Sequence, residues 1–186
     1  MCQIYIKKQK NKHIPHNNLI IFADMYIGLI SDTHCLFDEP LKRFLEPVDE
    51  IWHAGDFGNI ETADAIAAFK PLKGVYGNCD GQDVRKVHPY IQLMDVEGKK
   101  VLMMHIGGYP GRYDLNAFRL IEAHRPDIFV CGHSHILKVV NDKQRGMLVL
   151  NPGAAGKYGF HLVRTALRFR IDNGEIHDME VGEWPK

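Results

Sequence analysis

Five short segments of this 186-residue sequence carry side chains that could bind metal ions. They are Asp32-Thr33-His34, Gly55-Asp56, Gly77-Asn78-Cys79-Asp80, His105 and Gly132-His133-Ser134-His135. Carboxylate and amide oxygens together with imidazole nitrogens form a hard to borderline ligand set, which suits Mn²⁺, Fe²⁺, Ni²⁺ or Zn²⁺ better than a soft metal. The sequence therefore predicts a metal centre, provided that the fold brings these segments together.

Each segment stands at or near the end of an apolar run that is typical of a buried strand. The runs are 26–30, 50–53, 74–76, 100–106 and 128–131. Because side chains alternate along an extended chain, we expect Asp32 and His34 on one face, and likewise His133 and His135. The glycines before Asp56, Asn78 and His133 are expected to let the backbone turn sharply.

The elements that must position these residues differ between the two halves of the chain. In the first half, strands alternate with helices expected after Asp38 and Asn59, which favours parallel strands with functional loops at their carboxyl ends. The second half favours hairpins, which pair 91–96 with 100–106, 137–140 with 147–150, and 166–171 with 176–181, around one helix over 115–124. The pattern predicts an α/β fold.

Composition narrows the class of protein. The 23 basic and 23 acidic residues give a net charge of zero, so no broad field favours nucleic acid or an anionic membrane. Four separate cysteines without a CxxC pair favour a reducing, cytoplasmic location. No apolar run approaches the roughly 20 residues of a membrane span. We expect an N-terminal tail over residues 1–24, either disordered or not part of the native start, and one domain over 25–186.

In order and spacing, the five segments resemble the motifs of the calcineurin-like metallophosphoesterase superfamily: Asp-x-His, Gly-Asp, Gly-Asn, His and Gly-His-x-His. The resemblance covers nearly all of residues 25–182. The compact size and Asn151-Pro152-Gly153 are similar to small YfcE-type phosphodiesterases. This resemblance implies a four-layer α/β/β/α sandwich of two mixed β-sheets.

The resemblance also implies roles for seven ligands. Asp32, His34 and His135 would bind one divalent cation; Asn78, His105 and His133 would bind another; and Asp56 would bridge the two. A hydroxide bridging two cations about 3.5 to 4 Å apart would then hydrolyse a phosphoester, with a diester favoured. Mn²⁺ is the expected metal, with Ni²⁺, Fe²⁺ and Zn²⁺ as alternatives. The partner is expected to be a small phosphoester, and a homo-oligomer is compatible with the sequence.

The predicted catalytic residues are Asp56, Asn78, His133 and Cys79. Cys79 replaces the histidine that follows the Gly-Asn pair in the broader superfamily and that is thought to protonate the leaving group. A thiol could donate that proton, but a small packed cysteine is the commoner reason for this residue type. Cys79 as general acid is thus a hypothesis.

Other interpretations stay open. The same fold serves as a binding scaffold in the retromer's metallophosphoesterase-like subunit, which shows changed metal-site residues, whereas all expected ligands occur here. A nuclease would favour a basic surface, which this composition lacks. Tyr109, Arg112 and Tyr113 follow His105 in a Gly/Pro-rich loop and could contact substrate. Asp80 could support a ligand through a hydrogen bond, whereas His53 and His161 are expected to be structural or exposed.

Overall fold

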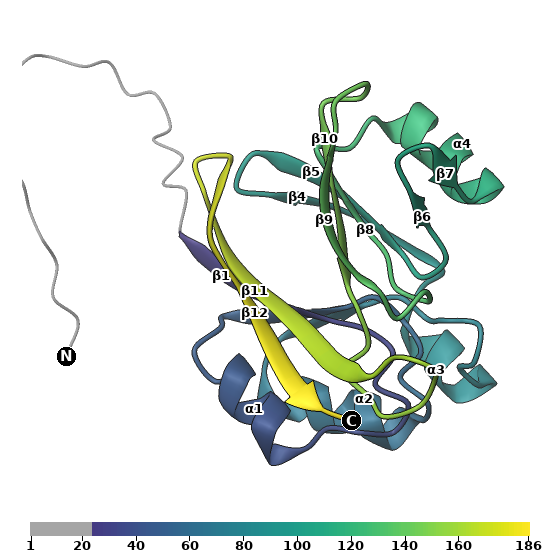
Figure 1. Ribbon diagram of the computed structural model, residues 1–186, viewed down its shortest axis with the longest axis vertical. Helices are drawn as coiled ribbons and strands as arrows, with labels where there is room; N and C mark the ends of the chain where they lie inside the picture. Colours follow the sequence, from purple (N-terminus) through teal and green to yellow (C-terminus); the bar gives the residue numbers. More distant parts are fainter. Residues whose placement is uncertain (1–23) are drawn as a thin grey trace, which may run out of the picture.

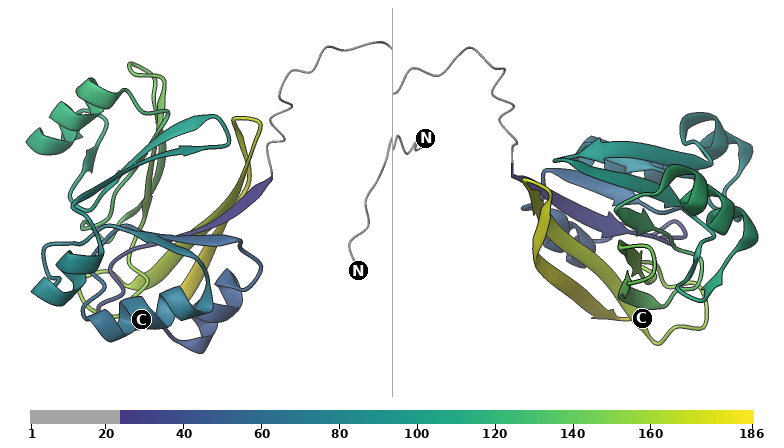
Figure 2. Two further views of the ribbon diagram at one scale, coloured as in Figure 1. Left: turned by 180° about the vertical axis from the view of Figure 1, so that it is seen from behind. Right: turned by 90° about the horizontal axis from the view of Figure 1, so that it is seen from above.

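The computed structural model describes residues 24–186, which form two five-stranded sheets packed face to face (Figures 1 and 2). The first sheet has the order β12 (Glu175–Pro185), β11 (Val163–Asp172), β1 (Met25–Ile30), β2 (Glu50–His53) and β3 (Leu72–Gly74). The second has the order β4 (Ile91–Val96), β5 (Lys99–Met104), β8 (Ile128–Val130), β10 (Met147–Pro152) and β9 (Leu137–Asp142). A small hairpin pairs β6 (Gly108–Tyr109) with β7 (Arg112–Tyr113).

Helices cover the outer faces of both sheets, so the layers are helix, sheet, sheet and helix (Figure 1). The first sheet carries α1 (Glu39–Leu45), α2 (Ile60–Phe69) and α3 (Gln82–Val87), and the second carries α4 (Leu115–His124). As the sequence predicts, Asp38 and Asn59 cap α1 and α2 by accepting hydrogen bonds from backbone N–H groups in the first helical turn. The predicted four-layer α/β/β/α sandwich is confirmed.

Alternation along single strands explains how the layers are joined. In β1, Ile27 and Leu29 point into the core between the sheets, whereas Tyr26 and Ile30 pack against the helices. On the second sheet, β5 turns Val101 and Met103 toward the same central core and its other apolar side chains toward α4. Strands buried on both faces fix their register strongly, because a slip of one residue would exchange the two faces.

The predicted topology also holds, with small shifts in the strand ends. β1, β2 and β3 pair in parallel, and β4–β5, β9–β10 and β11–β12 are antiparallel hairpins. The third strand, predicted at 74–76, lies instead at Leu72–Gly74, because Tyr76 already bonds outside the sheet to Pro89 O at 3.0 Å. The predicted tail, residues 1–24, lies outside the described residues except for Asp24, so that boundary stays a prediction.

Candidate metal centre

The five predicted segments meet where the loops after β1, β2, β3, β5 and β8 converge. Backbone hydrogen bonds join these loops: Asp32 N–H donates to Gly55 O at 2.9 Å, and Gly132 N–H donates to His105 O at 2.9 Å. The carboxyl ends of neighbouring parallel strands thus bring together residues far apart in the chain, such as Asp32 and His133, which are 101 positions apart.

Most ligand residues adopt a left-handed backbone, which corrects the expectation of extended Asp-x-His and His-x-His segments. The φ angles are +53° at Asp32, +44° at His34, +58° at Asp56, +65° at His133 and +57° at His135. Non-glycine residues seldom adopt this region, and such residues gather at functional sites. The side chains converge because the loops coil, and not because they share one face of a strand.

The first group of predicted ligands, here called the first ligand group, comprises Asp32, His34 and His135, whose ligand atoms lie within 4.8 Å of one another. Asp32 Oδ1 lies 3.1 Å from His135 Nε2 and 4.0 Å from His34 Nε2. Asp32 Oδ1 and His34 Nε2 are buried and have no hydrogen-bond partner among the described residues. Buried polar atoms without partners are rare and call for a bound ion or water.

The second ligand group surrounds His105. Its Nε2 atom lies 3.1 Å from Asn78 Oδ1, 3.3 Å from Asp56 Oδ2 and 3.9 Å from Asp32 Oδ1. The His133 ring stands edge-on to that of His105 at a centroid distance of 5.3 Å. Asp56 Oδ2 is also 3.8 Å from His34 Nε2, so Asp56 lies between the two groups, where the bridging role had been expected.

The electrostatics of the centre favour positive charge. Burial alone would lower the pKa of His105, but the hydrogen bond and charge of Asp56, together with the charge of Asp32, raise it above its ordinary value. Burial would likewise raise the pKa of Asp56, yet His105 and the backbone N–H of Cys79 more than offset that effect and lower it. The site therefore keeps the Asp56 carboxylate ionised, which favours a cation beside it.

Cys79 lies closer to the ligands than the sequence could indicate. Its Sγ atom is within 4.8 Å of ligand atoms of His34 and Asp56, and it accepts a hydrogen bond from Asn78 Nδ2 at 3.3 Å. Burial and the charge of Asp56 raise the pKa of the Cys79 thiol to about 11, so the thiol keeps its proton at neutral pH. Such a thiol is a weak acid, and its role as proton donor stays a hypothesis.

Asp80 ties the loops after β2 and β3 together. Its carboxylate accepts hydrogen bonds from the backbone N–H groups of Asp56 at 3.0 Å, Gly58 at 2.9 Å and Gly77 at 2.7 Å. Asp80 therefore supports a proposed ligand through hydrogen bonds, because its carboxylate fixes the backbone that carries Asp56. On the other side, Asn151 Nδ2 donates to Gly132 O at 2.7 Å and holds the loop of His133.

Two of the motif glycines are needed for close approach and not for the sharp turn that had been expected. A Cβ atom at Gly77 would lie 2.0 Å from Asp56 Oδ1, and one at Gly132 would lie 2.0 Å from Ser31 Oγ. Neither glycine has a left-handed φ, whereas Gly55 does, at +97°. The loops pack so tightly that a side chain at these positions would displace a ligand or its support.

His53 is structural. It is fully buried and stacks on Phe57 at a centroid distance of 3.6 Å. Its Nδ1 atom accepts from Gly55 N–H at 3.1 Å, so Nε2 carries the proton and donates to Thr33 Oγ1 at 2.9 Å. His53 thereby links the loop after β1, through Thr33, to the loop after β2, through Gly55.

Two grooves open from the segment 133–136, which they share. One, here called the apolar groove, is lined beyond that segment by Tyr158, Gly159, Phe160 and His161. The other is lined by Tyr109, Arg112, Tyr113, Asp114 and Lys138, and is here called the basic groove because its two cationic side chains outnumber its one carboxylate. The loop after His105 therefore does border the site, although Tyr113 also donates a hydrogen bond to Asp142 Oδ2 at 2.9 Å and so has a structural task.

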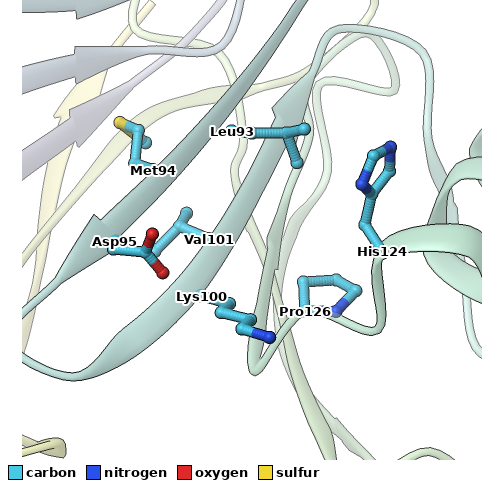
Figure 3. Close-up of a pocket in the computed structure, with 7 residues that line it drawn as sticks. All are labelled: Leu93, Met94, Asp95, Lys100, Val101, His124 and Pro126. Atoms are coloured by element: carbon cyan, nitrogen blue, oxygen red, sulfur yellow. The ribbon is translucent and has the colours of Figure 1, made fainter.

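A separate hollow lies between β4, β5 and the end of α4 (Figure 3). It is lined by Leu93, Met94, Asp95, Lys100, Val101, His124 and Pro126. None of the predicted ligands borders it. Among the described residues no helix is long and apolar enough to cross a membrane.

Comparison with known proteins identifies the class. A model of the calcineurin-like phosphoesterase superfamily domain matches residues 25–174, so the chain belongs to that superfamily. A search of curated proteins found no match.

Solved structures share the fold. A Thermotoga maritima protein is 27% identical with a TM-score of 0.64, and the match covers 86% of this chain and 99% of that one. A predicted phosphoesterase from Streptococcus pneumoniae is 19% identical with a TM-score of 0.60, covering 89% and 99%. Vps29 from Entamoeba histolytica, solved in complex with Zn²⁺, is 18% identical with a TM-score of 0.66, covering 87% and 99%.

Proposed function

We propose that the chain is a metal-dependent phosphoesterase that hydrolyses a small phosphodiester, similar to the YfcE-type group. The observation that carries this proposal is the convergence of acceptor atoms from five loops around Asp32 and Asp56. Superfamily membership supports the same reaction class.

The donor atoms fit divalent cations. Asp32 Oδ1 and His34 Nε2 face each other without hydrogen-bond partners in the described chain. His105 Nδ1 lies 2.7 Å from the carbonyl oxygen of Ala54, which can only accept, so Nδ1 carries a proton. When Nε2 is deprotonated, as binding of a metal requires, its lone pair is directed at Asn78 and Asp56. Lone pairs that face one another in this way repel unless a cation lies between them.

Two cations would be held as the motifs imply. The residues for the first are Asp32, His34 and His135, those for the second are Asn78, His105 and His133, and Asp56 is shared. Divalent cations supply Lewis acidity toward a phosphate and lower the pKa of a water molecule. Mn²⁺ is our preferred metal, with Ni²⁺, Fe²⁺ or Zn²⁺ as alternatives, because oxygen and imidazole ligands suit all four.

The protein's own contribution is orientation. The backbone N–H of Cys79 donates to Asp56 Oδ1 at 2.8 Å, which leaves Oδ2 directed at His105 and His34. Asp80 holds the backbone of the same residue. Asp56 therefore needs little reorganisation when it binds a cation or when charge develops on a phosphate.

The two grooves favour a diester over a monoester. A diester bound at His133 carries two ester substituents, and both grooves are lined by His133, Ser134 and Ile136. Tyr158 and Phe160 would contact an apolar substituent, whereas Arg112 and Lys138 would contact a polar or anionic one. A monoester would occupy one groove at most.

The deciding experiment measures hydrolysis of an aryl phosphodiester and an aryl phosphomonoester by metal-stripped protein, with and without Mn²⁺. We expect turnover that requires Mn²⁺ and a higher kcat/KM for the diester. Asp56→Asn should lower kcat/KM by at least about a hundredfold, since even outer-shell changes at metal sites reach that range. Asp64→Asn, an exposed carboxylate on α2, is the matched control and should leave the rate unchanged.

Absence of turnover with Mn²⁺, Ni²⁺, Fe²⁺ and Zn²⁺, in folded protein that binds these ions, would refute the proposal. The alternative, a non-catalytic binding scaffold of the same fold, would then take its place.

A further inference from the structure

His161 lies outside all five motifs, yet its ring contacts a proposed ligand. It stands in the segment between β10 and β11, and its Nδ1 atom is 3.2 Å from Nδ1 of His135. Its other nitrogen, Nε2, is 3.0 Å from the carbonyl oxygen of Gly156. Both nitrogens of His161 are therefore engaged.

The direction of these hydrogen bonds follows from the carbonyl group. Gly156 O can only accept, so Nε2 of His161 carries the proton. In a neutral ring Nδ1 is then an acceptor, and the proton between the two rings belongs to Nδ1 of His135. The remaining nitrogen of His135, Nε2, consequently keeps a free lone pair, and it is this atom that lies 3.1 Å from Asp32 Oδ1.

The backbone near His161 also packs closely against His135 and Asp32. A Cβ atom at Gly159 would lie 2.3 Å from His135 Nδ1, and Gly159 has a left-handed φ of +114°. Gly156 N–H donates to Asp32 O at 3.0 Å. The ring of Tyr158 also lies 4.9 Å from that of His34. The segment 156–161 thus touches all three residues in the first ligand group.

We propose that His161 is a positioning residue for the first metal subsite, where it fixes the tautomer and the ring orientation of His135. The inference rests on the proposed function only in requiring that the centre binds cations. Histidines that bind a metal commonly donate their second N–H to a carboxylate, a carbonyl or water. Here the acceptor is the imidazole of His161.

The effect should be confined to one subsite. His105, in the second ligand group, donates instead to Ala54 O and has no contact with segment 156–161 among the hydrogen bonds and ring contacts of the described chain. A change at His161 should therefore weaken the binding of the cation at the first subsite and leave the affinity for the other cation unchanged.

The test is calorimetric titration of metal-stripped protein with Mn²⁺. We expect two bound ions in the wild type. In His161→Phe, which keeps a ring but removes both nitrogens, one ion should bind about 10 to 100-fold more weakly and the other unchanged. In His161→Asn, whose amide oxygen can still accept from His135, affinity should stay within about threefold of wild type.

His177→Phe is the matched control, because that exposed histidine contacts only Asp178 among the hydrogen bonds of the described chain. Equal titrations of wild type and His161→Phe would overturn the inference. So would His161→Asn binding as weakly as His161→Phe, which would point to ring packing. Because the readout is metal binding, a wild type that binds two ions but hydrolyses nothing would refute the proposed function and leave this test intact.

Discussion

Two of the proposed ligand histidines, His105 and His135, are supported in different ways. His105 donates to the carbonyl oxygen of Ala54, directly after β2, so the sheet itself fixes its ring. His135 bonds instead to His161, in the irregular segment before β11. One half of the centre, around His105, is therefore supported by a strand end beside a recognisable motif, and the other half, around His135, by a segment that bears none. We expect the first half to be rigid and costly to disturb, and the second to yield more easily.

The largest expected loss of stability comes from adding a methyl group at Gly55, next to His105, and it is compared with the same change at Gly159, next to His135. Gly55→Ala would place Cβ 2.6 Å from His105 Nδ1, in a backbone with φ of +97° between packed strands. Strain and overpacking together should lower the free energy of unfolding by about 3 kcal/mol or more, measured by urea denaturation of metal-free protein. Gly159→Ala makes a similar clash with His135, but the segment can shift, and we expect a loss of about 1 kcal/mol.

Gly98→Ala separates backbone strain from overpacking as causes of the lost stability. Gly98 has φ of +80° and no atom within 4 Å of an added Cβ, so it reports the backbone cost alone. If Gly55→Ala and Gly159→Ala were equally destabilising, the contrast between a rigid and a yielding half would be wrong.

A smaller loss of stability is expected at Arg164, which holds the segment that supports His135. Arg164 donates from Nε to Ala155 O at 2.7 Å and forms two hydrogen bonds of 2.9 Å with Asp38, at the start of α1. Asp38→Asn leaves the Arg164 guanidinium buried without its counter-charge, which should cost about 2 to 3 kcal/mol at pH 7 in metal-free protein.

This cost should depend on pH. The hydrogen bonds and charge of Arg164 lower the pKa of Asp38 below its ordinary value of 3.8. The stabilisation from the pair is therefore present above that value and is lost as the pH falls through the folded-state pKa. The difference between wild type and Asp38→Asn should shrink below about pH 4, measured by denaturation across pH. A difference that stays constant with pH would exclude the ion pair as its source.

The smallest effect should appear at the rim. Tyr158 is 69% exposed and its ring lies 4.9 Å from that of His34. Tyr158→Ala should raise KM for an aryl diester about threefold to tenfold, with kcat and Mn²⁺ affinity unchanged. Tyr90→Ala, another partly exposed tyrosine, serves as control. A fall in metal affinity would instead make Tyr158 part of the support for the first ligand group.

Much of this centre could be predicted because its residues follow strands whose ends converge. The apolar runs of β1 and β2 and the caps at Asp38 and Asn59 are local signals, and the order of the motifs supplied the seven proposed ligands. The α3 helix gave no such signal. It is six residues long, buries only Val84 and begins at Gly81 without a side-chain cap.

The support of His135 could not be predicted for another reason. His161 is 26 residues from its partner, and the hydrogen bond depends on the course of a segment without periodicity. The left-handed backbone was equally hidden, since only a few per cent of non-glycine residues adopt it and the enrichment of Asp and His there is too small to predict it at a given position. Side-chain chemistry therefore identified the ligands, whereas their geometry came from contacts between distant loops.

The coiled loops bear on protein engineering. Five ligand residues hold a backbone that costs about 1 to 3 kcal/mol each in isolation. A designer who grafted the seven side chains onto ordinary strand ends of another scaffold would reproduce the composition of the centre without its shape. The unit to transplant is the set of interlocked loops, together with Asp80, Asn151 and His161, because these residues hold the ligands in a conformation that they would not adopt alone.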